Sequence, residues 1–191
     1  MKVLAATNNE HKVREFRQIL TPLGYEPVTP KELGINIDPE ENGTTFEENA
    51  LIKAEAFAKE AGIPVIADDS GLETDFLDGG PGVYSARYAP GSDKDRVNKL
   101  LDVMKDTENR GARFVSAVAM IFPDGRKICV RGECPGVIAR QPAGENGFGY
   151  DPVFFVESFG KTFAELTADE KNSISHRGRA LEALEKELKK L

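Results

Sequence analysis

The chain alternates between short apolar runs and longer segments in which apolar residues recur every three or four positions. Short runs rich in Val, Ile and Phe, bounded by Gly, Pro or polar residues, are typical of buried strands. They predict strands at residues 2–6, 26–29, 64–67, 72–77, 114–122, 127–133, 136–140 and 152–156. Helical spacing predicts helices at residues 11–20, 44–61 and 92–104, and a closing helix with Leu181, Leu184, Leu188 and Leu191 on one face. This order of elements is typical of an α/β fold.

The helix at residues 44–61 has the clearest local signals. Two overlapping capping boxes begin it, Thr44–Glu47 and Thr45–Glu48, and Gly62 suits its end. At about 100° per residue, its apolar residues form one stripe: Phe46, Ala50, Ala54, Phe57 and Ala61. Asn49 and Lys53 fall at the edge of that stripe. Lys53 is therefore either a lysine whose stem packs on the core while its amine reaches water, or a cation directed into a cleft.

The composition indicates a single globular domain. The chain has 191 residues, of which 40% are apolar and 30% charged, enough for an ample core. We find no signal peptide and no apolar run long enough to cross a bilayer, so we expect no membrane partner. The chain has two cysteines, which fits a reduced, cytoplasmic setting. With so few cysteines and histidines we expect no dedicated zinc site. We expect Cys129 to lie in the core. The net charge of −7 disfavours a nucleic acid polymer as partner.

Two adjacent carboxylates, Asp68 and Asp69, follow the predicted strand at residues 64–67. If the strand leaves the sheet there, they stand where α/β folds place their ligands. Adjacent residues of an extended chain point opposite ways, so we expect only one of the two to face a site. Such close like charges are costly unless a cation or a donor offsets them, and Mg²⁺ held by carboxylate oxygens would do so. The alternative is a polar turn that caps the next element.

A polar turn also follows the first predicted strand and leads into a helix. It reads Thr7, Asn8, Asn9, Glu10, His11 and Lys12. This layout resembles that of phosphate-binding loops, although it lacks the glycines and the Lys-Ser/Thr pair of a Walker A loop. Asn side chains, backbone N–H groups and Lys12 could hold phosphate. The alternative is a helix cap made by Thr7 or Asn9, which this stretch alone favours.

Two later stretches carry an aromatic group and a cation. Residues 144–151 place Phe148 between glycines, which frees the backbone to lay the ring against a planar base. The alternative is a bulge ahead of a core strand. Arg177 follows Ser175, a candidate cap, and so falls in the first turn of the closing helix. A cation there opposes the helix dipole, which is a hint of function.

Six motifs follow one another along the chain. They are Thr7-Asn8-Asn9 with Lys12, Phe46-Glu47-Glu48-Asn49-Ala50 with Lys53, Ala67-Asp68-Asp69-Ser70-Gly71-Leu72, Pro81-Gly82-Val83-Tyr84-Ser85-Ala86-Arg87, Gly147-Phe148-Gly149-Tyr150-Asp151-Pro152 and Ser175-His176-Arg177. In this order they resemble the inosine triphosphate pyrophosphatase family, whose members hydrolyse non-standard purine nucleoside triphosphates such as ITP, dITP and XTP. The resemblance covers essentially the whole chain.

The resemblance implies an α/β, mixed-sheet fold of two lobes with a central cleft, inosine triphosphatase-like. It implies one domain over residues 1–191 with a β-rich second lobe at roughly 112–145. It also implies a homodimer and Mg²⁺-dependent hydrolysis of the triphosphate to the monophosphate and pyrophosphate. Asp69 matches the catalytic proton acceptor and, with Glu41, the metal ligands. The implied substrate-binding residues are Thr7, Asn8, Asn9, Glu10, His11, Lys12, Lys53, Ser70, Phe148, Gly149, Tyr150, Asp151, Lys171, His176 and Arg177.

This activity makes chemical sense for a chain that is itself acidic. Lys12, Lys53 and Mg²⁺ could offset the charge of a triphosphate and of the leaving pyrophosphate, and Asp69 could orient and deprotonate water. Two alternatives stay open. One is a Maf-like nucleotide pyrophosphatase of different base specificity, in which we expect no Ser-His-Arg motif before the last helix. The other is a nucleotide-binding regulator without turnover, which would gain nothing from paired acids beside phosphate.

Overall fold

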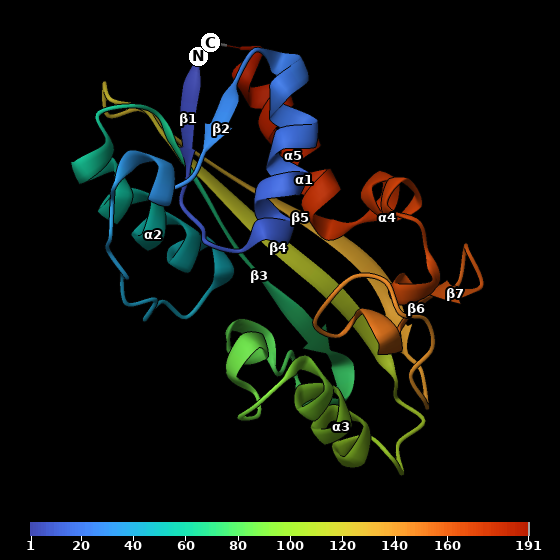
Figure 1. The fold of residues 1–191 in the computed structure, drawn as a ribbon. Coiled ribbons are helices and arrows are strands. Elements are labelled where there is room, and N and C mark those ends of the chain that lie inside the picture. Colours follow the sequence, from blue (N-terminus) through green and yellow to red (C-terminus); the bar gives the residue numbers. More distant parts are fainter. Residues whose placement is uncertain (191) are drawn as a thin grey trace. The chain divides into compact units, whose positions relative to one another are not determined.

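One mixed sheet carries the strands (Figure 1). The structure is a computed structural model that describes residues 1–190. Its strands are β1 (Lys2–Ala5), β2 (Glu26–Val28), β3 (Val65–Thr74), β4 (Gly111–Ile121), β5 (Lys127–Ile138), β6 (Phe154–Val156) and β7 (Lys161–Thr162). They are ordered β2-β1-β3-β4-β5-β6-β7. Strand β1 pairs parallel with β2 and β3, whereas β6 pairs antiparallel with β5 and β7. The predicted α/β fold with a mixed sheet is confirmed.

The helices are α1 (Glu10–Leu20), α2 (Phe46–Ala61), α3 (Asp93–Val103), α4 (Ala168–Ile174) and α5 (His176–Leu188). Helices α1, α2, α3 and α5 match the predicted ones, except that Leu191 lies outside the described residues. Helix α4 was missed, although Thr167 and Glu170 form the capping box that begins it. None of the helices in the described part of the chain is long and apolar enough to span a membrane.

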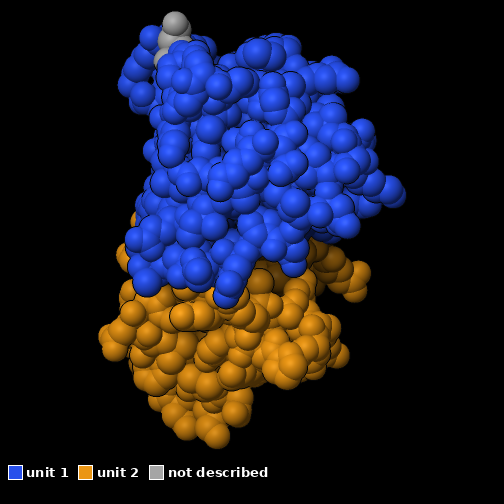
Figure 2. Space-filling model, turned by 90° about the vertical axis from the view of Figure 1, so that its left-hand side faces the viewer, with its two compact units in different colours: residues 1–69, 116–132, 176–191 blue, residues 70–115, 133–175 orange. Residues whose placement is uncertain are grey.

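The chain divides into two compact units (Figure 2). Unit 1 consists of residues 1–69, 116–132 and those from 176 onward, and unit 2 of residues 70–115 and 133–175. Strands β3, β4 and β5 each contribute residues to both units. The lobe expected at residues 112–145 therefore has residues in both units.

The core of unit 1 lies where α1 and α5 pack on the sheet. Helix α1 buries Phe16 and Leu20, and α5 buries Leu181 and Leu184, as their helical spacing predicts. They meet the apolar side chains Val3, Ala5, Ile66, Val118 and Met120 of the strands. Burial of these side chains fixes both helices on β1 and β3, and thereby fixes the polar residues that the same elements carry.

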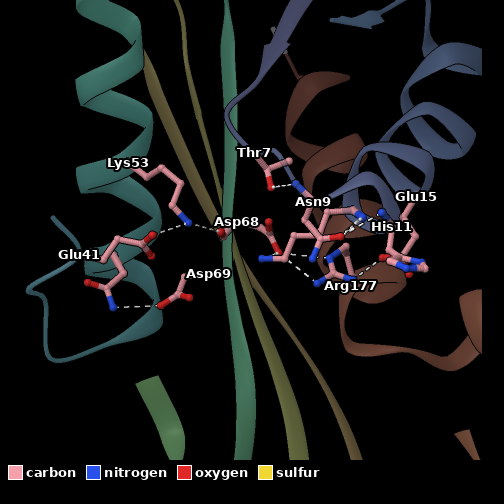
Figure 3. A network of polar contacts seen from close by, with 11 residues as sticks. Thr7, Asn9, His11, Glu15, Glu41, Lys53, Asp68, Asp69 and Arg177 are labelled. Atoms are coloured by element: carbon pink, nitrogen blue, oxygen red, sulfur yellow. Dashed lines mark hydrogen bonds and ion pairs between the residues drawn. The ribbon is translucent and has the colours of Figure 1, made fainter. Parts of the chain in front are cut away.

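Helix α2 lies on the other side of β3 from α1 and α5 (Figures 1 and 3). Its N-cap is Thr45, whose side chain accepts the N–H of Glu48, while Glu48 accepts the N–H and the hydroxyl of Thr44. The helix ends at Gly62, which has a φ of +62° that favours glycine. The predicted helix is thus confirmed in its end and, apart from the half-buried Ala61, in its buried stripe, but it begins at Phe46, and Glu48 binds Thr44 rather than closing the capping box expected with Thr45.

The core of unit 2 is aromatic. The rings of Phe114, Phe154 and Phe163 pack together, with centroids 4.5 to 5.6 Å apart. Helix α3 adds Val97 and Leu100 to the same cluster, as its spacing predicts. This core supports the loop at residues 144–151, because Tyr150 belongs to the same cluster.

Two strands run further than predicted. The strand expected at residues 64–67 continues through Asp68 and Asp69 to Thr74, so the acids do not mark the point where a strand leaves the sheet. A short 3₁₀ segment at Asp75–Leu77 replaces the second half of the strand expected at 72–77. Strand β5 joins the strands expected at 127–133 and 136–140 into one.

Cys129 is exposed, so its assignment to the core is wrong. Residues alternate between the two faces of a strand, and in β5 this alternation turns Cys129 outward and buries Cys134. The sequence carries this signal, because Lys127 and Arg131 share the face of Cys129, whereas Ile128 and Val130 lie on the other face with Cys134.

Candidate active site

The polar turn after β1 is built around the cap of α1. Asn9 is the N-cap, and its Oδ1 accepts the N–H groups of His11 at 2.9 Å and of Lys12 at 3.3 Å. Thr7 Oγ1 accepts the N–H of Asn9 at 3.1 Å. The predicted cap is therefore confirmed for Asn9, and it leaves a helix N-terminus, which favours anions, beyond the carboxyl end of β1. Asn8, Glu10 and His11 are exposed.

Asp68 and Asp69 point to opposite sides of β3, as strand geometry predicts (Figure 3). Asp68 contacts two of the predicted site residues. Its Oδ2 lies 3.0 Å from Lys12 Nζ and 3.2 Å from Arg177 Nη2. Arg177 also binds Glu15 through Nη1. Glu15 stands three residues after Lys12 on the same face of α1, a spacing that could have been noticed from the sequence.

The charges in this cluster shift one another's pKa. Burial alone would raise the pKa of Asp68, but the positive charges of Lys12, Arg177 and Lys53 outweigh it and hold that pKa well below its usual range. Burial lowers the pKa of Lys12, and the charge of Asp68 offsets part of that effect. Burial would also lower the pKa of Arg177, but Asp68 and Glu15 raise it. Asp68 is thus a buried carboxylate that stays ionised.

On the other side of β3, helix α2 presents Lys53 and Asn49 one turn apart. Lys53 Nζ lies 2.9 Å from Glu41 Oε1 and donates to the backbone oxygen of Asp68 at 3.1 Å. Its side chain is 14% exposed, so Lys53 is a cation held inside rather than one whose amine reaches water. Asn49 Nδ2 donates to Asp69 Oδ2 at 3.0 Å. The edge position of both residues on the predicted stripe is explained by these contacts.

Asp69 has the opposite electrostatic setting from Asp68. Burial raises its pKa, and the negative charge of Glu41 adds to that rise, while the hydrogen bond from Asn49 and the charge of Lys53 reduce it. A carboxylate whose proton affinity is raised is suited to accept a proton from water.

The donor set on this side of β3 fits a hard divalent cation. Glu41 and Asp69 offer carboxylate oxygens, and the pKa of Asp69 is raised mainly by burial and to a smaller extent by the negative charge of Glu41. Among residues 1–190 there is no group of three or more His, Cys, Asp or Glu that could hold a metal by itself. A Mg²⁺ site does not require three protein ligands, because Mg²⁺ binds through one or two carboxylates together with water and substrate phosphates.

Unit 2 gathers a second set of predicted residues. Lys171 Nζ lies 2.6 Å from Asp151 Oδ2, which also accepts the N–H of Phe148 at 2.9 Å. The same amine stands 5.0 Å from the centre of the Phe148 ring, within the range of a cation–π contact. Gly147 has a φ of +76°, and a Cβ there would lie 2.0 Å from Asp151 Oδ2. The glycine is therefore required for this loop conformation.

Two further contacts hold this loop. Asp93, the first residue of α3, accepts the N–H of Gly149 at 2.6 Å through Oδ2. Tyr150 is buried, and its hydroxyl donates to the backbone oxygen of Ser85 at 2.8 Å. Sequence reasoning missed Asp93, because its separation of 56 residues from Gly149 leaves no local signal. Tyr150, which the resemblance assigns to base recognition, lies in the core of unit 2.

Two other predicted site residues, Ser70 and His176, lie next to residues already described and are at least half-buried. Ser70 follows Asp69 on β3 and is half-buried. His176 is the first residue of α5 and is 5% exposed. In unit 1, Lys12 and Arg177 therefore meet at Asp68 on one side of β3, and Glu41, Lys53 and Asp69 lie on the other side. Unit 2 brings together Phe148, Gly149, Asp151 and Lys171.

Comparison with known proteins gives a consistent result. Residues 3–187 match the Ham1 family. The chain is similar to the dITP/XTP pyrophosphatase of Bacillus subtilis, with 51% identity over 97% of this chain and 96% of that protein. It is also similar to the dITP/XTP pyrophosphatase of Treponema denticola, with 47% identity over 99% of both. The solved structure of the Staphylococcus aureus Ham1 protein is similar too, with a TM-score of 0.91 and 43% identity over 99% of this chain and 98% of that one. A HAM1 protein from Coxiella burnetii gives a TM-score of 0.92 and 41% identity over the full length of both chains.

Proposed function

The chain belongs to the Ham1 family, and from that membership we propose that it hydrolyses the non-standard purine nucleoside triphosphates ITP, dITP and XTP to the monophosphate and pyrophosphate. The relatives that bear the name dITP/XTP pyrophosphatase are 47% and 51% identical over nearly the whole chain. One structural observation carries the proposal. The acid pair on β3 directs Asp68 to the mostly buried cations Lys12 and Arg177, and Asp69 to Asn49 of α2, where burial raises the pKa of Asp69.

The triphosphate is assigned to the cations and amides of unit 1. Lys12 and Lys53 carry the positive charge, and the N-terminus of α1 adds backbone N–H groups after the cap at Asn9. Both lysines are mostly buried, which strengthens their attraction for phosphate oxygens relative to lysines in water. They are placed to stabilise the charge that develops on the leaving pyrophosphate.

We assign the proton acceptor to Asp69 and the metal ligands to Glu41 and Asp69. Asp69 takes a proton from the attacking water, and Asn49 fixes the orientation of its carboxylate through the bond of 3.0 Å to Oδ2. When bound, Mg²⁺ supplies a positive charge that neutralises phosphate oxygens. As the family resemblance implies, we place the attack of water at the α-phosphorus, so that the bond from this phosphorus to the α–β bridging oxygen breaks and that oxygen leaves with the electron pair as part of pyrophosphate.

Base recognition is assigned to the loop of unit 2 and to the start of α5. The Phe148 ring offers a stacking surface, and Lys171 and Asp151 hold the loop that carries it. Arg177 has only donors, and His176 can donate as well. Donors directed at the 6-position donate hydrogen bonds to the oxo group of hypoxanthine or xanthine, whereas the amino group of adenine is itself a donor and cannot accept them, so the site discriminates against adenine.

We further propose that the enzyme is a cytoplasmic homodimer. Light scattering after size-exclusion chromatography tests the dimer, because it should give twice the 20.9 kDa of one chain. A mass of one chain over the whole concentration range of the assay would refute that part of the proposal.

The activity is tested by pyrophosphate release from ITP, dITP, XTP, GTP, ATP and dTTP with Mg²⁺. We expect turnover of the first three and little of the others. A preference for dTTP or another standard nucleotide would favour a Maf-like pyrophosphatase of different base specificity. Tight binding without release of pyrophosphate from any of the six would favour a nucleotide-binding regulator.

A further inference from the structure

Asp68 joins three segments of unit 1 through one carboxylate oxygen. From β3, its Oδ2 meets Lys12 Nζ of α1 at 3.0 Å and both Nε and Nη2 of Arg177 of α5 at 3.2 Å. The last two residues are separated from Asp68 by 56 and 109 positions, respectively. The side chain of Asp68 is 0% exposed and that of Arg177 3% exposed. The contacts are therefore made without water between them.

The cluster is electrically balanced. Lys12 and Arg177 carry two positive charges, and Asp68 and Glu15 carry two negative ones. Loss of the Asp68 charge alone would leave two mostly buried cations with one carboxylate. Lys12 would then have no ion-pair partner among residues 1–190, because Asp68 is the one that the structure gives it.

The geometry of Asp68 is not the one expected if the residue served only to stabilise the fold. Its second oxygen, Oδ1, is buried and has no hydrogen-bond partner among the described residues. A buried polar atom without a partner is costly, and buried ion pairs are poor stabilisers compared with apolar packing. Both facts point to orientation of the two cations as the use of this carboxylate.

We propose that Asp68 is a positioning residue that holds Lys12 and Arg177 in place for the substrate. This inference rests on the proposed function, in which Lys12 binds the triphosphate and Arg177 reads the base. Holding long, flexible side chains in place before binding removes an entropic cost from binding itself. Asp68 therefore contributes to two separate properties, the affinity for the triphosphate and the preference between bases, although it touches the substrate in neither case.

Three variants separate this role from a purely structural one. Asp68→Asn keeps the shape of the side chain and removes its charge. Lys12→Gln removes the partner, and the double variant removes both, which restores the charge balance with Arg177 and Glu15. Met120→Ala is the control, because Met120 lies fully buried in the core of unit 1 and outside the site. It should lower the urea midpoint of unfolding while leaving KM and base preference unchanged.

We expect Asp68→Asn to raise KM for ITP about tenfold or more, the loss typical of a charge-assisted hydrogen bond that is no longer held in place. It should also lower the ratio of kcat/KM for ITP to that for ATP, through Arg177. The double variant should show the KM of Lys12→Gln rather than the product of the two single effects. A KM and a base ratio within twofold of wild type in Asp68→Asn would overturn the proposal, as would single effects on KM that multiply.

Two outcomes need a separate readout. If Asp68→Asn fails to fold, the charge-balanced double variant carries the test: a lower base ratio than that of Lys12→Gln supports the proposal, and an equal ratio overturns it. If the wild-type chain releases no pyrophosphate from ITP, the proposed function fails. Calorimetric binding of inorganic tripolyphosphate to the same variants then still tests Asp68, with about tenfold weaker binding expected for Asp68→Asn and unchanged binding contradicting its role.

Discussion

Replacing Lys53 by methionine removes one cation from α2 while keeping most of the apolar stem. In the folded chain its amine has two contacts, an ion pair of 2.9 Å with Glu41 and a hydrogen bond of 3.1 Å to the backbone oxygen of Asp68. Glu41 is 30% exposed and can turn to water when Lys53 is lost. The change therefore leaves no isolated buried charge behind.

From these contacts we estimate how much folding stability and how much activity Lys53→Met should lose. A partly exposed ion pair contributes about 0–1 kcal/mol and a hydrogen bond about 0.5–1.5 kcal/mol, so the free energy of unfolding should fall by roughly 1–2 kcal/mol. Loss of one donor to the charge of a transition state typically lowers kcat by about 10²–10³-fold, or roughly 2.7–4 kcal/mol. We therefore expect Lys53→Met to lose more transition-state stabilisation than folding stability, and to remain folded at 25 °C.

Two measurements on one protein check this prediction. Steady-state pyrophosphate release from ITP gives kcat and KM, and urea unfolding gives the stability. Lys59→Met is the matched control, because Lys59 is an exposed lysine in the last turn of the same helix. A Lys53→Met variant with kcat/KM within threefold of wild type would refute the assignment of Lys53 to the triphosphate. A large loss of stability with normal kinetics would make its role structural.

Three other outcomes follow from the site. Asp69→Asn removes both the proton acceptor and one metal ligand, so it should abolish turnover, while calorimetry should still detect ITP binding through Lys12 and Lys53; turnover above one tenth of wild type would contradict this. Excess EDTA should abolish pyrophosphate release and added Mg²⁺ should restore it, whereas full activity in EDTA would exclude the metal role of Glu41 and Asp69. Gly147→Ala should raise KM for ITP and lower the melting temperature, because a Cβ there would meet Asp151 Oδ2 at 2.0 Å; an unchanged KM would show that the Phe148 loop does not bind the base.

Features fixed by neighbouring residues were predictable from the sequence. The start and end of α2 depend on Thr45 and Gly62, which act on backbone groups within one turn. The cap of α1 at Asn9 is equally local. The edge position of Lys53 was visible as well, because a helix fixes the direction of each side chain relative to its apolar stripe.

Features that depend on contacts between distant residues could not be predicted from the sequence. Two adjacent acids are typical of a turn, yet β3 continues through Asp68 and Asp69. The strand accommodates Asp68 because Lys12 and Arg177 offset its buried charge, and no local pattern shows that these residues meet it. The contact of Asp93 with Gly149 was hidden for the same reason. The exposure of Cys129 was predictable, because alternation along β5 puts it on the same face as Lys127 and Arg131 and opposite Ile128 and Val130.

The central claim is that the chain converts a non-standard purine triphosphate to its monophosphate by attack of water on the α-phosphorus. Mass spectrometry of an equimolar mixture of ITP and ATP, incubated with the protein and Mg²⁺ in ¹⁸O-labelled water, tests it most directly. The account predicts IMP that carries one ¹⁸O atom, unlabelled pyrophosphate, and ATP that is consumed far more slowly than ITP. Label in pyrophosphate or in free phosphate, or equal consumption of both nucleotides, would contradict it.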